Sequence, residues 1–198
     1  MAWAPAYITL AELKAFVRVT DAVDDAELTV AIEAASRAID QHTNRQFGKT
    51  DTVEERFYTA RPDRKRGMWV APVDDFMTVA GLVVKVGGVT TTELTKEPVN
   101  AAAKVRPWTR LAIDPTAAVK PTGEDYEVAV TATWGWSAVP VPVTQACRLQ
   151  ASRFASRRNS PYGIAGSPDD GSEMRLLARV DPDVGVALRS FVRPRRFG

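Results

Sequence analysis

The hydrophobic residues of this chain change their spacing twice, and that change limits the folds open to it. Residues 1–52 and 139–160 repeat apolar side chains at helical intervals, whereas residues 53–138 gather β-branched and aromatic side chains into short runs. This order predicts an α+β fold. We expect a two-part helical core, an antiparallel β-subdomain inserted over residues 53–138, and a final region over residues 161–198 with a loop, a short helix and an extended basic tail.

Two helices are predicted in the first part of the core. Two residue pairs have the spacing of a capping box: Thr9 with Glu12, and Asp24 with Glu27. The first pair predicts a helix over residues 10–19, and the second predicts a longer helix that ends near Asn44. The apolar seam of the longer helix has intervals of four, three, four and three residues: Leu28, Ile32, Ala35, Ile39 and His42.

The inserted region is predicted to form strands separated by Pro and Gly. The runs are residues 53–60, 68–71, 79–86, 108–113 and 126–136. Gly87 and Gly88 fit a two-residue hairpin turn, because glycine adopts positive φ without a Cβ penalty. The last run alternates most clearly, with one apolar face made of Tyr126, Val128, Val130, Ala132, Trp134 and Trp136.

Helical spacing returns after residue 139. Pro142 suits a first helical turn, and the third helix should end before Pro161. Its predicted seam consists of Val143, Ala146, Cys147, Gln150, Ala151 and Phe154. Residues 162–172 have loop composition. Asp181 and Pro182 then open a short helix that ends by Pro194, with Val184, Leu188 and Phe191 on one side.

The sequence contains few of the side chains that commonly act in catalysis. With one cysteine, Cys147, and one histidine, His42, the chain can form neither an internal disulfide nor a multi-histidine metal site. Cys147 lies in an apolar seam, so we expect a buried thiol and no nucleophile. His42 closes the seam of the second helix, so we expect it to be packed and hydrogen-bonded. Phosphate-binding and calcium-binding loop motifs are absent, and the sequence therefore predicts no enzyme, no metal and no cofactor.

The charge is divided unevenly along the chain. Residues 145–198 hold ten arginines and five acidic residues, so the preceding 144 residues carry a net negative charge. This distribution disfavours a protein that grips nucleic acid over its whole face, although an Arg-rich C-terminal nucleic-acid-binding module stays an alternative. No apolar run is long enough to cross a membrane and the first ten residues lack signal-peptide features, so we expect a soluble, unexported protein with no membrane partner.

Large aromatic residues near the end of the inserted region are assigned to packing. Trp134, Trp136 and Trp108 could stack on bases, but the charges nearest Trp134 in sequence are acidic. We therefore expect Trp134 and Trp136 to have a structural or subunit-interface role, and we assign the same role to Phe154 of the third helix.

The order of these elements resembles the head-to-tail adaptor, or connector, family of long-tailed bacteriophages. The resemblance is carried by the two N-terminal helices, the β insertion, the segment Trp134-Gly135-Trp136-Ser137-Ala138-Val139-Pro140, the Ala-rich helix, Pro161-Tyr162-Gly163 and the basic tail. It covers nearly the whole chain and is most specific in residues 8–47 and 130–163. The resemblance lies in the order of the elements more than in an invariant sequence motif.

The resemblance implies a structural virion protein of the head-tail neck, assembled in the bacterial host cytoplasm. It implies a homo-oligomeric ring of about twelve subunits under the portal vertex, with genome DNA passing through the bore without specific binding. Further partners would be the portal protein and the next neck or tail-completion protein. The portal-docking residues would be Leu188, Arg189, Phe191, Arg193, Arg195, Arg196 and Phe197. A stopper or tail-completion protein of the same neck is the nearest alternative.

Overall fold

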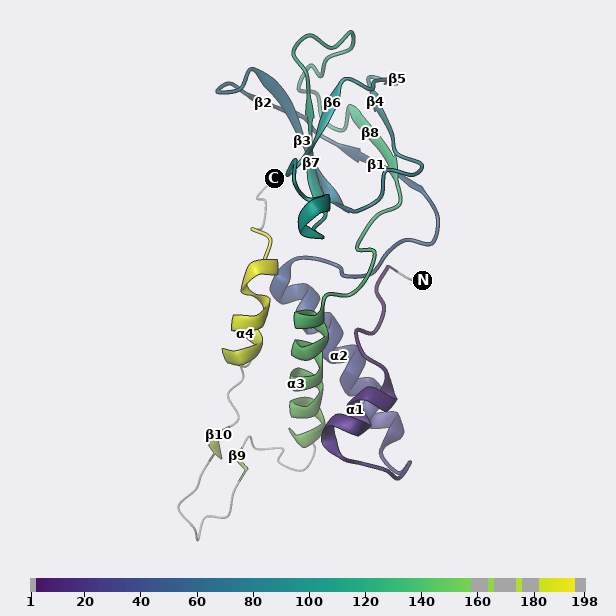
Figure 1. Cartoon of the computed structure of the whole chain (residues 1–198), viewed down its shortest axis with the longest axis vertical. Coiled ribbons are helices and arrows are strands. Elements are labelled where there is room, and N and C mark those ends of the chain that lie inside the picture. The colour runs from purple at the N-terminus through teal and green to yellow at the C-terminus, as the bar shows by residue number, and fades with distance from the viewer. Residues whose placement is uncertain (1–2, 158–163, 166–173, 176–181, 195–198) are drawn as a thin grey trace. The chain divides into compact units, whose positions relative to one another are not determined.

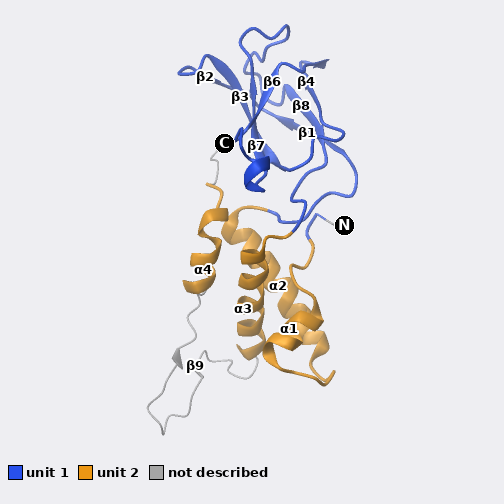
Figure 2. Ribbon diagram, viewed as in Figure 1, with its two compact units in different colours: residues 1–4, 46–138 blue, residues 5–45, 139–198 orange. Residues whose placement is uncertain are grey.

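The chain folds into helices and antiparallel sheets, which confirms the α+β class (Figure 1). The computed structural model describes residues 3–157, 164–165, 174–175 and 182–194. The chain divides into two compact units (Figure 2). Unit 1 contains residues 1–4 and 46–138, and unit 2 contains residues 5–45 and 139–198. The unit of strands therefore begins several residues before position 53, where the spacing of apolar residues changes.

The first helix of unit 2, α1 (Leu10–Val17), begins with the predicted capping box. The Glu12 amide donates to Thr9 Oγ1 at 3.2 Å, and the Thr9 amide donates to Glu12 Oε2 at 2.8 Å. The helix ends before residue 19 because Arg18 adopts the left-handed conformation with a φ of 60°. Leu13 is the fully buried side chain of α1 and anchors it to the rest of the unit.

The second helix, α2 (Asp25–Thr43), ends at Asn44 as predicted, but its N-terminus differs from the prediction. The Asp24 side chain makes no cap hydrogen bond, so the second capping box does not form. The first four seam residues are buried, but His42 is exposed, and the prediction that it is packed is wrong. The buried face turns instead toward Ser36, Asp40 and Thr43, and Thr43 is held by a bond from its Oγ1 to the Ile39 carbonyl oxygen at 2.8 Å.

The remaining helices of unit 2 are α3 (Val141–Arg157) and α4 (Pro182–Leu188), and a 3₁₀ turn (Arg189–Phe191) follows α4. The predicted seam of α3 is buried from Val143 to Ala151, and Phe154 is half-buried. α3 packs against α1, α2 and α4. A short strand, β9 (Ile164–Ala165), lies in the region predicted as loop and pairs with β10 (Met174–Arg175), which follows that region.

Unit 1 contains two four-stranded sheets in which every strand pairing is antiparallel. The first has the order β1-β8-β4-β5, with bounds Glu54–Tyr58, Val128–Ala132, Val83–Val86 and Val89–Thr90. The second has the order β2-β3-β7-β6, with bounds Arg61–Asp63, Met68–Phe76, Trp108–Ile113 and Leu94–Glu97. A 3₁₀ turn, η1 (Ala102–Lys104), precedes β7.

All five predicted runs contain a strand, but the bounds of several strands differ from the prediction and two edge strands were missed. The Gly87-Gly88 turn joins β4 to β5, with Val86 opposite Val89 and both glycines at positive φ. The edge strands β2 and β6 were not predicted, because Arg61-Pro62-Asp63 and the largely polar β6 carry little apolar alternation. Tyr126 is exposed and lies outside β8, so the alternating strand begins two residues later than predicted.

The core of unit 1 lies where the two sheets supply buried side chains to one cluster. It includes Phe76, Leu111, Val128, Val130 and Trp134, all fully or almost fully buried. The Trp134 ring lies 6.0 Å from Phe76 and 5.7 Å from Tyr58, measured between ring centroids. Burying side chains of this size stabilises the folded state by roughly 1.5 to 3 kcal/mol each.

Candidate interaction surfaces of the helical unit

The cysteine and the histidine do not form a reactive pair. The Cys147 side chain is buried on α3, with Sγ 3.5 Å from Ser36 Oγ, and this burial raises the pKa of the thiol. An activated cysteine shows the opposite shift. His42 is exposed on α2. Among the described residues, no group of three or more His, Cys, Asp or Glu side chains could hold a metal ion.

The C-terminal segment is packed against the rest of unit 2. Val184, Leu188 and Phe191 are buried within unit 2. Arg45 Nε donates to the Phe191 carbonyl oxygen at 2.7 Å, and the Arg193 amide donates to the Thr43 carbonyl oxygen at 2.8 Å. These contacts fasten α4 and the following turn to the end of α2.

The structure describes four of the seven predicted portal-docking residues. Leu188 and Phe191 are buried within unit 2, and their predicted contact with the portal stays a prediction. Arg189 is exposed and Arg193 is half-buried, so both can present charge at the surface. Arg195, Arg196 and Phe197 lie outside the described residues.

One exposed surface follows α4 and its 3₁₀ turn, and we call it the α4 face. It consists of Val186, which is 76% exposed, and Arg189, three residues later. Residues at this spacing lie on one side of a helix. Arg189 forms no hydrogen bond or ion pair with any described residue. The α4 face thus combines an apolar side chain with an uncompensated positive charge.

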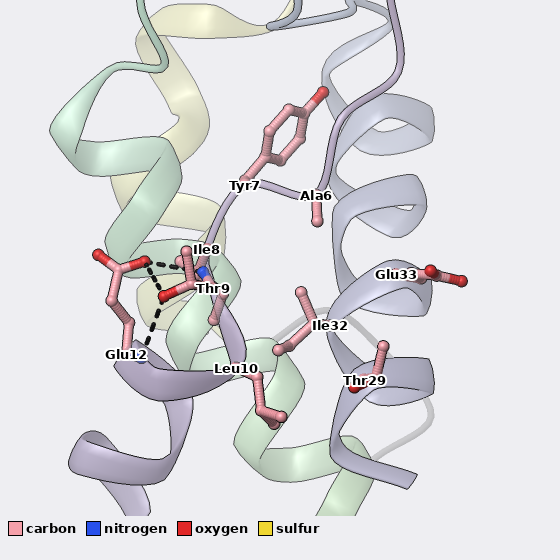
Figure 3. A pocket seen from close by; sticks show the side chains of 9 residues that line it. All are labelled: Ala6, Tyr7, Ile8, Thr9, Leu10, Glu12, Thr29, Ile32 and Glu33. Atoms are coloured by element: carbon pink, nitrogen blue, oxygen red, sulfur yellow. Dashed lines mark hydrogen bonds between the residues drawn. The ribbon is translucent and has the colours of Figure 1, made fainter. Parts of the chain in front are cut away.

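A second surface is the hollow between the N-terminal segment and α2, which we call the N-terminal groove (Figure 3). It has a volume of about 400 Å³ and is lined by Ala6, Tyr7, Ile8, Thr9, Leu10, Glu12, Thr29, Ile32 and Glu33. Ile8 and Ile32 are buried, and Leu10 is half-buried. Glu33 is exposed and forms no hydrogen bond or ion pair with any described residue.

The N-terminal segment that forms this groove is held along α2 by polar contacts. The Tyr7 hydroxyl donates to Asp40, and the Tyr7 amide donates to Ser36 Oγ at 3.1 Å. Arg37 Nη2 donates to the Pro5 carbonyl oxygen at 2.7 Å. These residues were not singled out from the sequence, because a bond between positions thirty residues apart leaves no periodic signal.

Two further grooves are lined by His42 and by Phe154, two residues for which the sequence predicted a role in packing or at an interface. His42 and Arg193 line a groove of about 570 Å³ at the end of α2, where the described chain stops. Phe154 lines a groove of about 420 Å³ together with Leu28 and Ala31. Phe154 is half-buried, and its predicted role at a subunit interface stays a prediction.

The two tryptophans assigned to packing lie in unit 1. Trp134 is fully buried and donates from Nε1 to the Glu54 carbonyl oxygen at 2.9 Å. Trp136 is buried and donates from Nε1 to Asp75 Oδ2 at 2.9 Å. Both side chains are satisfied inside the unit, which favours the structural alternative over the subunit-interface alternative.

The two units define an α+β protein, and the candidate surfaces described for its helical unit are grooves and an exposed helix face. Residues 7–62 match the family model described as phage gp6-like head-tail connector protein. The resemblance to the head-tail connector family is thus confirmed over these residues, which contain α1, α2 and eight of the nine residues that line the N-terminal groove.

The chain also has a likeness among solved structures, and none among curated proteins. It is similar to a chain of the neck of a native GTA particle computed with C12 symmetry, with 18% sequence identity and a TM-score of 0.47. The likeness covers 98% of this chain and 94% of that chain. No curated protein matches. No helix among the described residues is both long and apolar enough to span a bilayer.

Proposed function

We propose that this protein is a non-enzymatic structural protein of a phage neck that acts as a head-to-tail adaptor. In this role its copies form a ring under the portal vertex and extend the DNA channel toward the tail. The observation that carries the proposal is the match of residues 7–62 to the head-tail connector family model. The matched region contains α1, α2 and the tethered N-terminal segment, which together form much of unit 2.

The exposed charges of α2 are mostly acidic and support a channel that does not hold DNA, although unit 2 as a whole carries two more cations than acids. α2 exposes Glu27 and Glu33, whereas its Asp25 is paired with Lys14 at 2.6 Å and its Asp40 is buried beside Arg37. On α3, the guanidinium of Arg148 lies 3.1 Å from Glu12 Oε1, so this arginine is already paired. Affinity for DNA depends on neutralising many phosphates, and an acidic surface lets the duplex slide. These charges disfavour a nucleic-acid-binding module.

We assign portal docking to the basic residues that follow the anchored 3₁₀ turn. Phe191 and Leu188 hold the segment to unit 2, and the chain continues past Arg193 toward Arg195, Arg196 and Phe197. An arginine-rich segment with a terminal aromatic residue offers bidentate donors and an apolar anchor to a protein partner.

The test is a binding measurement between purified portal rings and two forms of the chain. A chain truncated after Pro194 should lose portal binding while it keeps the circular dichroism spectrum of the full chain, because the described core of unit 2 ends at Phe191. The matched control replaces Arg64 and Lys65, two exposed cations of unit 1, by alanine and should bind normally. Portal binding by the truncated chain would contradict the docking role.

The same preparation distinguishes an adaptor from a nucleic-acid-binding protein. A steep fall of DNA affinity with salt, with a log-log slope of about −0.9 per phosphate neutralised, would favour the nucleic-acid alternative. Electron microscopy of assembled particles tests the location, and absence of the protein from the neck would refute the proposed function.

A further inference from the structure

The hairpin formed by β2, β3 and their connecting turn carries the densest positive charge of unit 1. Four of the six residues at positions 61–66 are cations, namely Arg61, Arg64, Lys65 and Arg66, and all four are exposed. Figure 1 shows the turn between β2 and β3 projecting from the rest of unit 1. Unit 1 as a whole contains equal numbers of cationic and acidic residues, so the hairpin concentrates positive charge that the unit balances elsewhere.

The acidic residues beside the hairpin are already engaged. Asp63 Oδ1 accepts the Lys65 amide at 3.1 Å and the Arg66 amide at 3.4 Å, so this carboxylate shapes the turn. Glu97 of β6 is buried and pairs with Arg66 of the turn and with Arg110 of β7, whose Nε lies 3.5 Å from Glu97 Oε2. Two exposed guanidinium groups thus share one carboxylate, and the positive charge stays in excess.

Arg61 and Arg110 lie on the same face of the sheet. Arg61 is opposite Val70, Val70 is opposite Ala112, and Arg110 is two positions from Ala112 on β7. The cations of the turn therefore continue onto one side of the sheet. We call this surface the basic patch, and it consists of Arg61, Arg64, Lys65, Arg66 and Arg110.

Three side chains of the basic patch have no counter-charge. Those of Arg61, Arg64 and Lys65 form no hydrogen bond or ion pair with any described residue. The patch also lacks an apolar anchor, because the exposed large apolar residues of unit 1 all lie outside β2, β3, β6, β7 and the β2–β3 turn. Protein interfaces are centred on buried apolar or aromatic side chains. Guanidinium and ammonium groups without apolar neighbours suit phosphate oxygens instead.

We propose that the basic patch binds the phosphate backbone of duplex DNA, without regard to base sequence. Each copy neutralises about three phosphates, one for each cation that has no partner in the protein. Electrostatic contacts of this kind allow a protein to slide along the duplex, so a few of them are compatible with the passage of DNA. The inference goes beyond the proposed function, which assigns no DNA contact to unit 1.

The test measures DNA affinity of the full chain against salt concentration. Fluorescence anisotropy with a short labelled duplex compares the original protein with a triple variant that carries Arg61→Ala, Arg64→Ala and Lys65→Ala. The triple variant should bind at least about tenfold more weakly at low salt, and the magnitude of its log-log slope should fall by about 3, because about 0.9 is lost per phosphate contact. A second duplex of unrelated sequence should bind the original protein within about threefold of the first.

The matched control removes the same number of charges from other turns of unit 1. It carries Lys49→Ala, Lys104→Ala and Lys120→Ala, three exposed cations outside the basic patch. This control should change DNA affinity by no more than about twofold at low salt. Circular dichroism and tryptophan fluorescence verify that both triple variants are folded. If the control weakens binding as much as the patch variant does, the affinity follows net charge alone and the inference is wrong.

Two further arms identify other sources of the binding. In the chain truncated after Pro194, the patch variant should still lose affinity to the same extent. A salt dependence that survives the patch variant and disappears on truncation would overturn the inference in favour of the Arg-rich C-terminal module. Labelled polyglutamate replaces DNA in the second arm, and a patch that binds polyglutamate but not the duplex would indicate an acidic protein partner and refute the DNA contact.

The outcome for the DNA contact is separable from the outcome for the proposed function. A protein that binds portal rings and lies in the neck, but whose DNA affinity is unchanged in the patch variant, keeps its function and loses this contact. A protein whose patch variant loses DNA affinity, but which never binds the portal, keeps the contact and loses the adaptor role.

Discussion

At Gly135 the backbone adopts a conformation that a side chain would not tolerate. Its φ is 104°, and a Cβ atom would lie 1.9 Å from the Gly48 carbonyl oxygen. That oxygen accepts a hydrogen bond from the Trp136 amide at 2.9 Å, and the Gly135 amide donates to the Asp75 carbonyl oxygen at 2.6 Å. The glycine thus allows two buried tryptophans to follow each other through a closely packed turn.

We expect Gly135→Ala to lower the free energy of unfolding of unit 1 by about 3 kcal/mol or more, because both the conformation and the space exclude a methyl group. Gly185→Ala is the matched control: Gly185 lies in α4 with open space at its Cβ position. That change should stabilise the protein by about 0.5 to 1 kcal/mol. Urea unfolding measures both, and equal effects would contradict the interpretation.

The free energy of unfolding should depend on pH through the buried thiol of Cys147. Burial raises the pKa of the thiol, so the folded protein keeps this proton to a higher pH than the unfolded chain does. The resulting stability is fully present below the pKa of the unfolded thiol, about 8.5, and is lost as the pH rises through the folded pKa. The free energy of unfolding of the original protein should therefore approach that of Cys147→Ala above about pH 8.5.

The measurement is urea unfolding of both proteins at several pH values under reducing conditions. Subtracting the free energy of unfolding of Cys147→Ala from that of the original protein removes the effect of lysine and tyrosine titration, because both proteins contain the same lysines and tyrosines. A difference that stays constant up to about pH 10 would show that the thiol does not titrate differently in the two states.

At the scale of the element, the two helices with a predicted capping box behave differently. Thr9 and Glu12 exchange both capping hydrogen bonds, whereas Asp24 makes no cap bond with its side chain. The Thr9 bonds also lower the pKa of Glu12. Of the two helices with capping-box spacing, only α1 thus forms the capping box.

We expect Thr9→Ala to destabilise unit 2 by about 1 kcal/mol, because an orphan amide of the first turn of α1 loses its acceptor. Thr20→Ala, at an exposed position between α1 and α2, is the control and should change the free energy of unfolding by no more than about 0.5 kcal/mol. Thermal unfolding followed by circular dichroism compares the two, and indistinguishable midpoints would argue against the capping box.

At the scale of the whole molecule, the two units carry different spectroscopic signals. All five tryptophans, at positions 3, 69, 108, 134 and 136, belong to unit 1. The four α-helices found among the described residues all belong to unit 2. Tryptophan fluorescence therefore reports the unfolding of unit 1, and the helical circular dichroism signal mainly reports that of unit 2.

We expect the two signals to respond separately to mutations in the two units. Gly135→Ala should shift the fluorescence midpoint more than the circular dichroism midpoint. Leu13→Ala, which empties a buried position of α1 at a cost of about 2 to 5 kcal/mol, should do the reverse. Equal shifts of both signals in both variants would show that the chain unfolds as one cooperative body.

The elements that were predicted correctly are determined by residues close together in the sequence. The seam of α3, the alternation of β8 and the Gly87-Gly88 turn all follow from residues within a few positions of each other. The spacing of Val184, Leu188 and Phe191 was also predicted, and all three are buried. The docking role that the resemblance implied for Leu188 and Phe191 stays a prediction.

What the sequence determined by itself is the order of helices and strands, the α+β class and the family to which residues 7–62 are similar, because periodicity and capping are properties of neighbouring residues. What only the tertiary structure decided is which residues meet: Tyr7 with Asp40, Arg45 with Phe191, and the exposure of His42. Those contacts join positions far apart in the chain, and their energies depend on packing that no local pattern records. The grooves arise in the same way, so they became visible only in the folded protein.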